Sequence, residues 1–224
     1  MKRIKRNLAL SICLLISFVF WTIAVSFVDV QPIGPNGSSV GFSTINEFFH
    51  NLTGVNFDLY IITDWLGLVP VFICMAFAIV GLVQLISRKS LFKVDFSILT
   101  LGVFYIVTIA VYLFFEYFVV NYRPVLINSY LEASYPSSTT MLVMCVMPTA
   151  LMQFNNRIKN KIFNKSVNII IVGFIIFMVI GRLISGVHWI SDIIGGALFS
   201  AGLVMMYYFV NLCKRTWYFL FNYL

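Results

Sequence analysis

Six apolar stretches of about 20 residues divide the chain, and each is long enough to cross ~30 Å of lipid hydrocarbon as a helix. They are residues 8–27, 62–86, 96–115, 139–154, 167–185 and 190–212. Of the 224 residues, 61% are hydrophobic and only 10% are charged, which excludes an ordinary soluble domain. The sequence therefore predicts an all-α membrane protein, a bundle of six transmembrane helices that forms one domain over residues 1–224.

The basic residues predict the orientation of this bundle. Thirteen of the fifteen Lys and Arg residues precede the first stretch, follow the sixth, or lie in the second and fourth connections. Positively charged connections stay on the cytoplasmic side. We therefore expect a multi-pass plasma-membrane protein with both termini in the cytoplasm. The net charge of +7 then indicates contact with anionic lipid head groups, and nucleic acid is not an expected partner.

The first stretch has an alternative interpretation as a signal peptide, because it follows the basic sequence Met-Lys-Arg-Ile-Lys-Arg. Its apolar run of about 20 residues exceeds the ~7–15 residues of a signal-peptide core. We therefore expect a retained helix.

The four cysteines, Cys13, Cys74, Cys145 and Cys213, all lie inside apolar stretches. Their spacing is not that of metal ligands, so they are interpreted as small hydrophobic side chains of membrane helices. Neither a disulfide nor a zinc site is expected from them.

Two basic residues, Arg123 and Arg182, fall on the side expected to face outward. A positive charge there opposes the orientation rule and calls for a reason. Connectivity brings the outer ends of the last four stretches together, so both guanidinium groups are expected near Pro136-Ser137-Ser138-Thr139. There Ser137 or Ser138 would cap a helix whose N-terminus carries a partial positive charge. Two arginines beside a helix N-terminus predict a phosphate site.

His188 and Asp192 lie at the edge of this expected site, four residues apart. That spacing places both side chains on one face of a helix or on its approach. A carboxylate hydrogen-bonded to one imidazole nitrogen fixes the tautomer and leaves the other nitrogen as a nucleophile or base. Beside two arginines, this pair is typical of phosphoryl transfer.

These residues resemble the three motifs of the type 2 phosphatidic acid phosphatase superfamily, the lipid phosphatase and vanadium haloperoxidase-like proteins. The family motifs are K-x6-R-P, P-S-G-H and S-R-x5-H-x3-D. The chain has, in the same order, Arg123-Pro124, then Pro136-Ser137-Ser138-Thr139, then Arg182-x5-His188-x3-Asp192. The six expected spans agree with the family as well, so the resemblance covers essentially the whole chain.

The resemblance implies a role for each matching residue. His188 would be the nucleophile that forms a phosphohistidine, and Asp192 would orient it. Arg123 and Arg182 would bind the phosphate, and Ser137 would contribute to the same cradle. Ser138 and Thr139 are further candidates for phosphate contact, and no metal or cofactor is implied.

Three positions depart from the family motifs. Glu116 replaces the lysine, Ser138-Thr139 replaces Gly-His, and Gly181 replaces the serine. The missing histidine is the general acid that protonates the leaving alkoxide, a contribution of roughly 10²–10⁴-fold, and a threonine hydroxyl is too weak an acid to replace it. A leaving phosphate departs without a proton, so a lipid diphosphate such as a polyprenyl diphosphate is the expected substrate. Glu116 would either repel phosphate, hold the site shut by pairing with an arginine, or donate a proton.

Two further residues are weaker candidates. His50 follows Ser43-Thr44-Ile45-Asn46-Glu47-Phe48-Phe49 in a segment that predicts an interfacial helix opening with an N-cap. It is interpreted as an exposed residue of that helix, or alternatively as a replacement acid that folds over the site. Asp64 is interpreted as an N-cap, or as a site residue because intramembrane carboxylates are often functional.

Three functions compete on this sequence. The first is a membrane phosphatase acting on a lipid phosphate or diphosphate at the outer face. The second is a catalytically impaired relative that binds such a lipid or serves as a scaffold. The third is a transporter of an anionic lipid, which would need polar residues through the bilayer that the apolar stretches hardly contain.

Overall fold

The computed structural model describes the backbone of residues 2–222 and the side chains of residues 4–214, and its regular structure is helical. The α-helices are α1 (Lys2–Phe27), α2 (Ser43–Thr53), α3 (Phe57–Leu66), α4 (Leu68–Arg88), α5 (Phe96–Tyr117), α6 (Ser138–Arg157), α7 (Lys161–Ile184) and α8 (Ile190–Asn222). Two short 3-10 turns, Pro35–Gly37 and Leu91–Lys93, lie in the connections.

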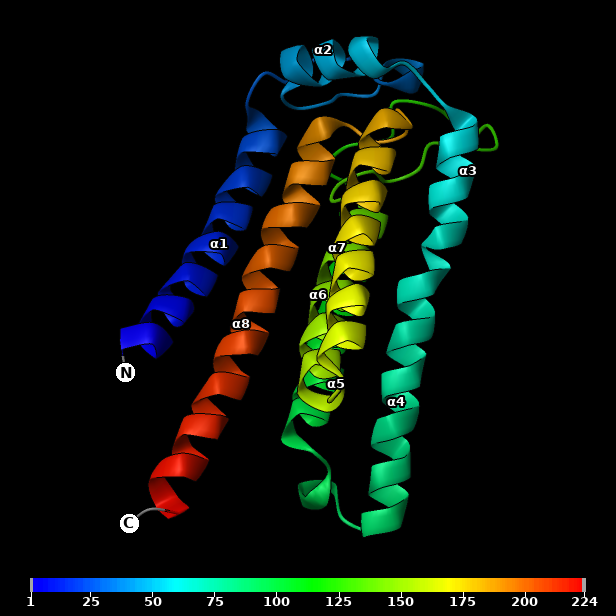
Figure 1. Cartoon of the computed structure of the whole chain (residues 1–224). Helices are drawn as coiled ribbons and strands as arrows, with labels where there is room; N and C mark the ends of the chain where they lie inside the picture. Colours follow the sequence, from blue (N-terminus) through cyan, green and yellow to red (C-terminus); the bar gives the residue numbers. More distant parts are fainter. Residues whose placement is uncertain (1, 223–224) are drawn as a thin grey trace.

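Five segments of the described chain are helical, long enough and apolar enough to cross a membrane. They are Ile4–Phe27, Phe57–Arg88, Phe96–Tyr117, Lys161–Ile184 and Ile190–Lys214. The predicted second span begins earlier than expected, because α3 and α4 follow each other around Gly67 and run as one column in Figure 1. The chain is an all-helical, multi-pass membrane protein.

The predicted fourth span is a helix, α6, but it does not meet the same hydropathy requirement. Its polar side chains are packed inside the bundle, with Thr140, Thr149 and Gln153 each no more than 1% exposed. Helix α6 contacts α5, α7 and α8, so these side chains meet protein and not lipid. A helix covered by its neighbours does not need an apolar surface all round. Its crossing of the membrane stays a prediction.

Helix α2 lies across one end of the bundle, above the ends of α1, α7 and α8, and both chain termini lie at the other end (Figure 1). Its outward face carries Ile45, Phe48 and Leu52, which are 49%, 62% and 70% exposed. The predicted helix is confirmed, but Ser43 is its first residue and not its cap. Asp29 fills the capping role: its carboxylate accepts hydrogen bonds from the Thr44 N–H and the Ser43 hydroxyl, both at 2.8 Å. The Thr44 N–H is the main reason why the pKa of Asp29 falls to about 2.

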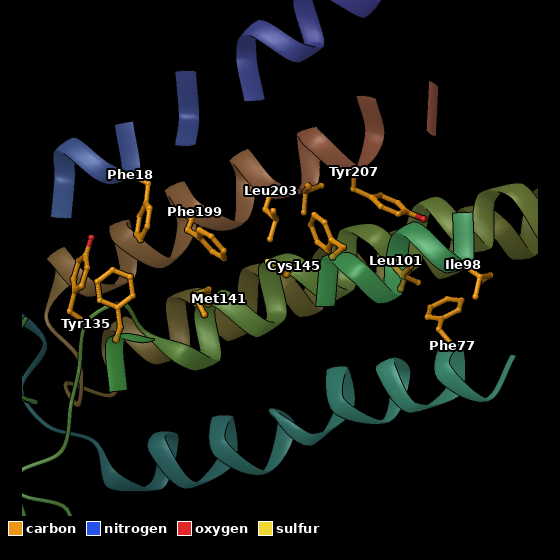
Figure 2. Packing of buried hydrophobic residues seen from close by; sticks show 14 of the residues in the cluster. Phe18, Phe77, Ile98, Leu101, Tyr135, Met141, Cys145, Phe199, Leu203 and Tyr207 are labelled. Carbon is orange, nitrogen blue, oxygen red and sulfur yellow. The ribbon is translucent and has the colours of Figure 1, made fainter. Parts of the chain in front are cut away.

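The core connects the helices to the loop that precedes α6 (Figure 2). Phe18 of α1 lies 5.3 Å from Phe199 of α8 and 5.9 Å from Phe115 of α5, measured between ring centroids. Tyr135 belongs to the loop, yet it is 1% exposed, and its hydroxyl lies 2.7 Å from the Thr22 hydroxyl of α1. Aromatic packing and this hydrogen bond therefore fix the loop to the bundle.

Candidate active site

A cavity of about 320 Å³ opens at the end of the bundle that carries α2. Its polar lining comes from the end of α5 (Tyr112, Glu116), the following loop (Arg123, Glu132, Ser134), the start of α6 (Ser138) and the turn before α8 (His188). We call it the His188 cavity. The loop and the helix ends thus bring together side chains that are up to 76 positions apart in the sequence.

A hairpin in the loop between α5 and α6 positions two of these residues. Tyr122 and Ala133 form an antiparallel bridge, so the neighbouring residues face each other in register. The Arg123 N–H donates to the Glu132 carbonyl at 3.0 Å, and the Ser134 N–H donates to the Asn121 carbonyl at 2.9 Å. Arg123 lies on one arm and Ser134 on the other, and both reach the cavity.

The turn between α7 and α8 positions His188. Gly186 has a φ of +68°, and a side chain there would meet the Gly54 carbonyl oxygen at 2.0 Å. Only glycine fits this left-handed and crowded position. On the other side of His188, the indole of Trp189 donates to the Tyr122 carbonyl at 2.7 Å, which joins this turn to the hairpin.

Ser134 lies between His188 and Asp192. Its hydroxyl donates to the Asp192 carboxylate at 2.5 Å, and the same oxygen lies 3.0 Å from Nδ1 of His188. The expected direct hydrogen bond between Asp192 and His188 is therefore wrong, because a residue from another segment occupies the space between them. No periodic or motif signal marks Ser134, since its position depends on the hairpin register.

Asp192 is buried within a polar network of its own. Besides the Ser134 hydroxyl, its carboxylate accepts from the Trp189 N–H at 3.1 Å, the Asn121 amide at 3.2 Å and the Ser191 hydroxyl at 3.2 Å. Asn46 of α2 extends the network by donating to Ser191 at 2.9 Å. A group that receives four donors is held as an acceptor-only carboxylate in one orientation.

His188 presents its other nitrogen to the cavity. Nε2 lies 3.3 Å from the Arg123 guanidinium, which can only donate. Burial lowers the pKa of His188 well below its ordinary value of 6.5, and the charges of Arg123 and Arg182 lower it further. The imidazole is therefore neutral, with a lone pair on Nε2 directed at the place where an anion would meet Arg123.

Arg182 is close enough to influence His188 but does not line the cavity. It is 1% exposed, and its guanidinium donates to Thr63 at 3.2 Å and to Asp64 at 3.4 Å, both on α3. The Tyr60 ring lies 5.0 Å away. The expected pair of arginines is thus divided: Arg123 faces the cavity, and Arg182 anchors α3 to α7.

The three residues at the start of α6 have different surroundings. Ser137 is the N-cap, as one of the two predicted alternatives had it, and accepts from the Thr140 N–H. Ser138 lines the His188 cavity. Thr139 is 9% exposed and lines a second, mainly apolar cavity of about 320 Å³ between α3, α4, α5 and α6, with Asp64 in its wall. Tyr112 and Ser138 line both spaces, so this side cavity adjoins the first.

Two carboxylates line the His188 cavity, and the sequence had indicated only one of them. Glu132 pairs with Arg123, with 3.1 Å between Oε2 and Nε. Glu116, which stands where the family has lysine, lines the cavity beside them. The ion pair of Arg123 is thus with Glu132, an interaction set by the hairpin and not by a motif.

The weaker candidates lie outside the His188 cavity, although Asp64 lines the side cavity. His50 is half-buried against Trp189, with 5.5 Å between the ring centroids, and burial lowers its pKa. Asp64 is not an N-cap, because α3 begins at Phe57 and is capped by Asn56; it is the partner of Arg182. Within the described residues, no three His, Cys, Asp or Glu side chains gather as a metal site would require.

Comparison with known proteins identifies the family. The model of the PAP2 superfamily matches residues 96–215, more than half of the chain. The chain belongs to the PAP2 superfamily. Among curated proteins, none matches the sequence significantly.

A solved structure agrees in fold with this PAP2 protein. It is the crystal structure of a transmembrane PAP2-type phosphatidylglycerolphosphate phosphatase from Bacillus subtilis, with a TM-score of 0.56 and 20% identity over 92% of this chain and 96% of that one. The resemblance inferred from the motifs is therefore confirmed at the level of family and fold.

Proposed function

We propose that this PAP2 protein hydrolyses a lipid-linked phosphate through a phosphohistidine on His188. The observation that carries the proposal is the position of Nε2, which lies 3.3 Å from the Arg123 guanidinium on a side chain that lines the cavity. A nucleophile next to a planar cation is suited to attack a phosphate whose oxygens that cation holds. Asp192 and the buried network behind it keep the imidazole in place.

The reaction has two displacements. In the first, Nε2 forms a bond to phosphorus while the bond from phosphorus to the leaving oxygen breaks. In the second, water attacks the phosphorus and displaces Nε2, which releases dihydrogen phosphate carrying both protons of the water and restores neutral His188. Arg123 and the N-terminus of α6 stabilise the charge on the transferring group in both steps.

Thr139 supports a diphosphate as the preferred substrate. In a phosphate monoester the leaving group is an alkoxide, which requires a proton in the transition state. A threonine hydroxyl is not acidic enough to provide that proton. In a lipid diphosphate the leaving group is the lipid monophosphate, which needs no proton to depart. The side cavity has mainly apolar walls and adjoins the phosphate end through Tyr112 and Ser138, which suits a lipid chain such as that of a polyprenyl diphosphate.

The distribution of charge supports an outward-facing site in the plasma membrane. Both termini lie at the end of the bundle opposite α2 and the His188 cavity (Figure 1). The basic connections, including Arg88-Lys89, belong to that same end, and such residues favour the cytoplasmic side. The cavity would then face outside.

Phosphate release by the purified protein tests this function. Polyprenyl diphosphate, phosphatidic acid and phosphatidylglycerolphosphate are compared at equal concentration in the same detergent, with His188→Ala as the control. We expect the fastest release from the diphosphate and none above background from the variant. Faster release from either monoester would overturn the substrate preference, and equal rates for wild type and His188→Ala would overturn the enzyme function.

The second candidate is a binding protein that no longer turns over. It is favoured by the engagement of Arg123 with Glu132 and by the presence of Glu116 in the same cavity, since both reduce the positive charge available to a phosphate. Binding of a lipid diphosphate that is lost in Arg123→Gln, without release of phosphate, would support this candidate.

A further inference from the structure

We propose that Ser134 is a positioning residue for the nucleophile: it connects Asp192 to His188 and selects the tautomer in which Nε2 carries the lone pair. The inference rests on the proposed function for its kinetic consequence, but not for its structural one. Ser134 lies outside the three motifs that the chain shares with its family.

The single proton of the Ser134 hydroxyl determines the tautomer of His188. A serine hydroxyl has a single proton, and Ser134 donates it to Oδ2 of Asp192 at 2.5 Å. The hydroxyl oxygen can then only accept from Nδ1 of His188, which lies 3.0 Å away. Nδ1 must therefore carry the imidazole proton, and Nε2 must be free of one.

The opposite tautomer of His188 is disfavoured at both ring nitrogens. With the proton on Nε2, the ring would direct an N–H at Arg123, which has no acceptor to offer. Nδ1 would then need a donor, and Ser134 would have to withdraw its proton from the Asp192 carboxylate. Hydrogen bonds to an ionised acceptor are the stronger ones, so the first arrangement prevails.

Three neighbouring interactions restrain Ser134 and its partner Asp192. Its N–H donates to the Asn121 carbonyl at 2.9 Å, and the Asn121 side chain donates to Asp192. The next residue, Tyr135, is fixed in the core beside Phe18 (Figure 2). Ser134 itself is 2% exposed. A side chain so restrained can transmit the orientation of a carboxylate to a ring it also contacts.

Removal of the hydroxyl should affect catalysis more than binding. In Ser134→Ala, Nδ1 loses the hydroxyl that links it to Asp192, and only the backbone interaction of position 134 with the ring remains. The tautomer and the orientation of the ring are then less restrained. We expect kcat to fall about 10- to 100-fold, the effect of one charge-linked hydrogen bond, while KM changes less than about threefold. Ser134→Thr keeps the hydroxyl and should recover part of the loss.

A matched control separates this role from a general loss of packing. Ser200 is also fully buried, and its hydroxyl donates to the Met141 carbonyl in α6, away from the cavity. Ser200→Ala should leave kcat within about twofold of wild type while removing a comparable buried hydrogen bond. An equal loss of kcat in Ser200→Ala and Ser134→Ala would show that Ser134 has only a packing role.

The deciding experiment reads the tautomer directly. The chain has only two histidines, His50 and His188, so His50→Gln labelled with ¹⁵N-histidine gives the signals of His188 alone. Two-bond ¹H–¹⁵N couplings should show protonated Nδ1 in the parent and a changed or mixed tautomer after Ser134→Ala. Protonated Nε2 in the parent, or an unaltered tautomer in the variant, would overturn the proposal. Because this measurement requires no turnover, it distinguishes a failure of this inference from a failure of the proposed phosphatase function.

Discussion

At the scale of single residues, the surroundings of His188 favour the neutral imidazole that the proposed nucleophile requires. The side chain is 4% exposed, and its burial disfavours the protonated form before any charge is considered. The positive charges of Arg123 and Arg182 act in the same direction. The same arginine that would bind the phosphate therefore also keeps the attacking nitrogen free of a proton.

This arrangement predicts the pH dependence of the reaction. The pKa of His188 is lowered from 6.5, so the neutral, attacking form persists as the pH falls through 6.5 and is lost only well below it. We expect kcat/KM to decline on the acid side at a pH well under 6.5. Measurement of kcat/KM with one substrate between about pH 4 and pH 8 reports this limb for the free enzyme.

Arg123→Gln provides the control for the pH profile. The variant loses one of the charges that lower the pKa of His188, so its acid limb should move up toward 6.5 although its rate is lower. Ionisation of the substrate phosphate near pH 6 affects wild type and variant equally, so the shift between them is the informative quantity. An acid limb that stays at the same pH in both proteins would contradict this account.

At the scale of elements, the contact between α3 and α7 depends on a departure from the family motif. Gly181 stands where the family has serine, and a side chain there would lie 2.8 Å from the Thr63 methyl group. This close approach lets Thr63 accept a hydrogen bond from Arg182. The absence of a side chain at position 181 therefore brings α3 within reach of the buried arginine.

Gly181→Ser should accordingly lower the stability of the folded protein. The added side chain forces α3 away from α7 or strains the Thr63 side chain, and overpacking of this kind costs about 1–3 kcal/mol. Thermal unfolding in detergent should show a lower midpoint than wild type. Thr63→Ser removes the obstructing methyl and keeps the hydroxyl that Arg182 needs, so the double variant should recover part of the loss. A double variant no more stable than Gly181→Ser would show that the Thr63 methyl is not the obstacle.

At the scale of the whole molecule, the sequence predicted the architecture better than the site. Apolar length gave the helices, and motif order correctly placed Arg123, His188 and Asp192 at one end. The motifs did not predict the partners of Arg182, namely Thr63 and Asp64, which lie about 120 positions earlier. They also gave no indication of Ser134 and Glu132, which reach the cavity through hairpin register. The prediction of six spans also assumed that every span has an apolar surface. Helix α6 carries polar side chains instead, and neighbouring helices cover them.

The two adjoining cavities suggest how the molecule as a whole selects its substrate. The His188 cavity is polar and contains the proposed nucleophile, whereas the side cavity is mainly apolar and includes Thr139 in its wall. Ser138 lines both, so position 139 lies on the side where the leaving group would sit. Under the proposed function, a histidine placed there would reach the leaving oxygen, and without it the protein would favour leaving groups that need no proton.

Thr139→His tests whether position 139 acts on the leaving group. A histidine at this position would supply the missing proton, and general acid catalysis contributes about 10²–10⁴-fold, so release from phosphatidic acid should rise by about 10²-fold or more. Release from polyprenyl diphosphate should change less than about tenfold, because its leaving phosphate gains little from protonation. Phosphate release from both lipids measures the two effects together. The gain must disappear when His188→Ala is added, and an equal rise for both substrates would mean that position 139 acts on phosphate binding and not on the leaving group.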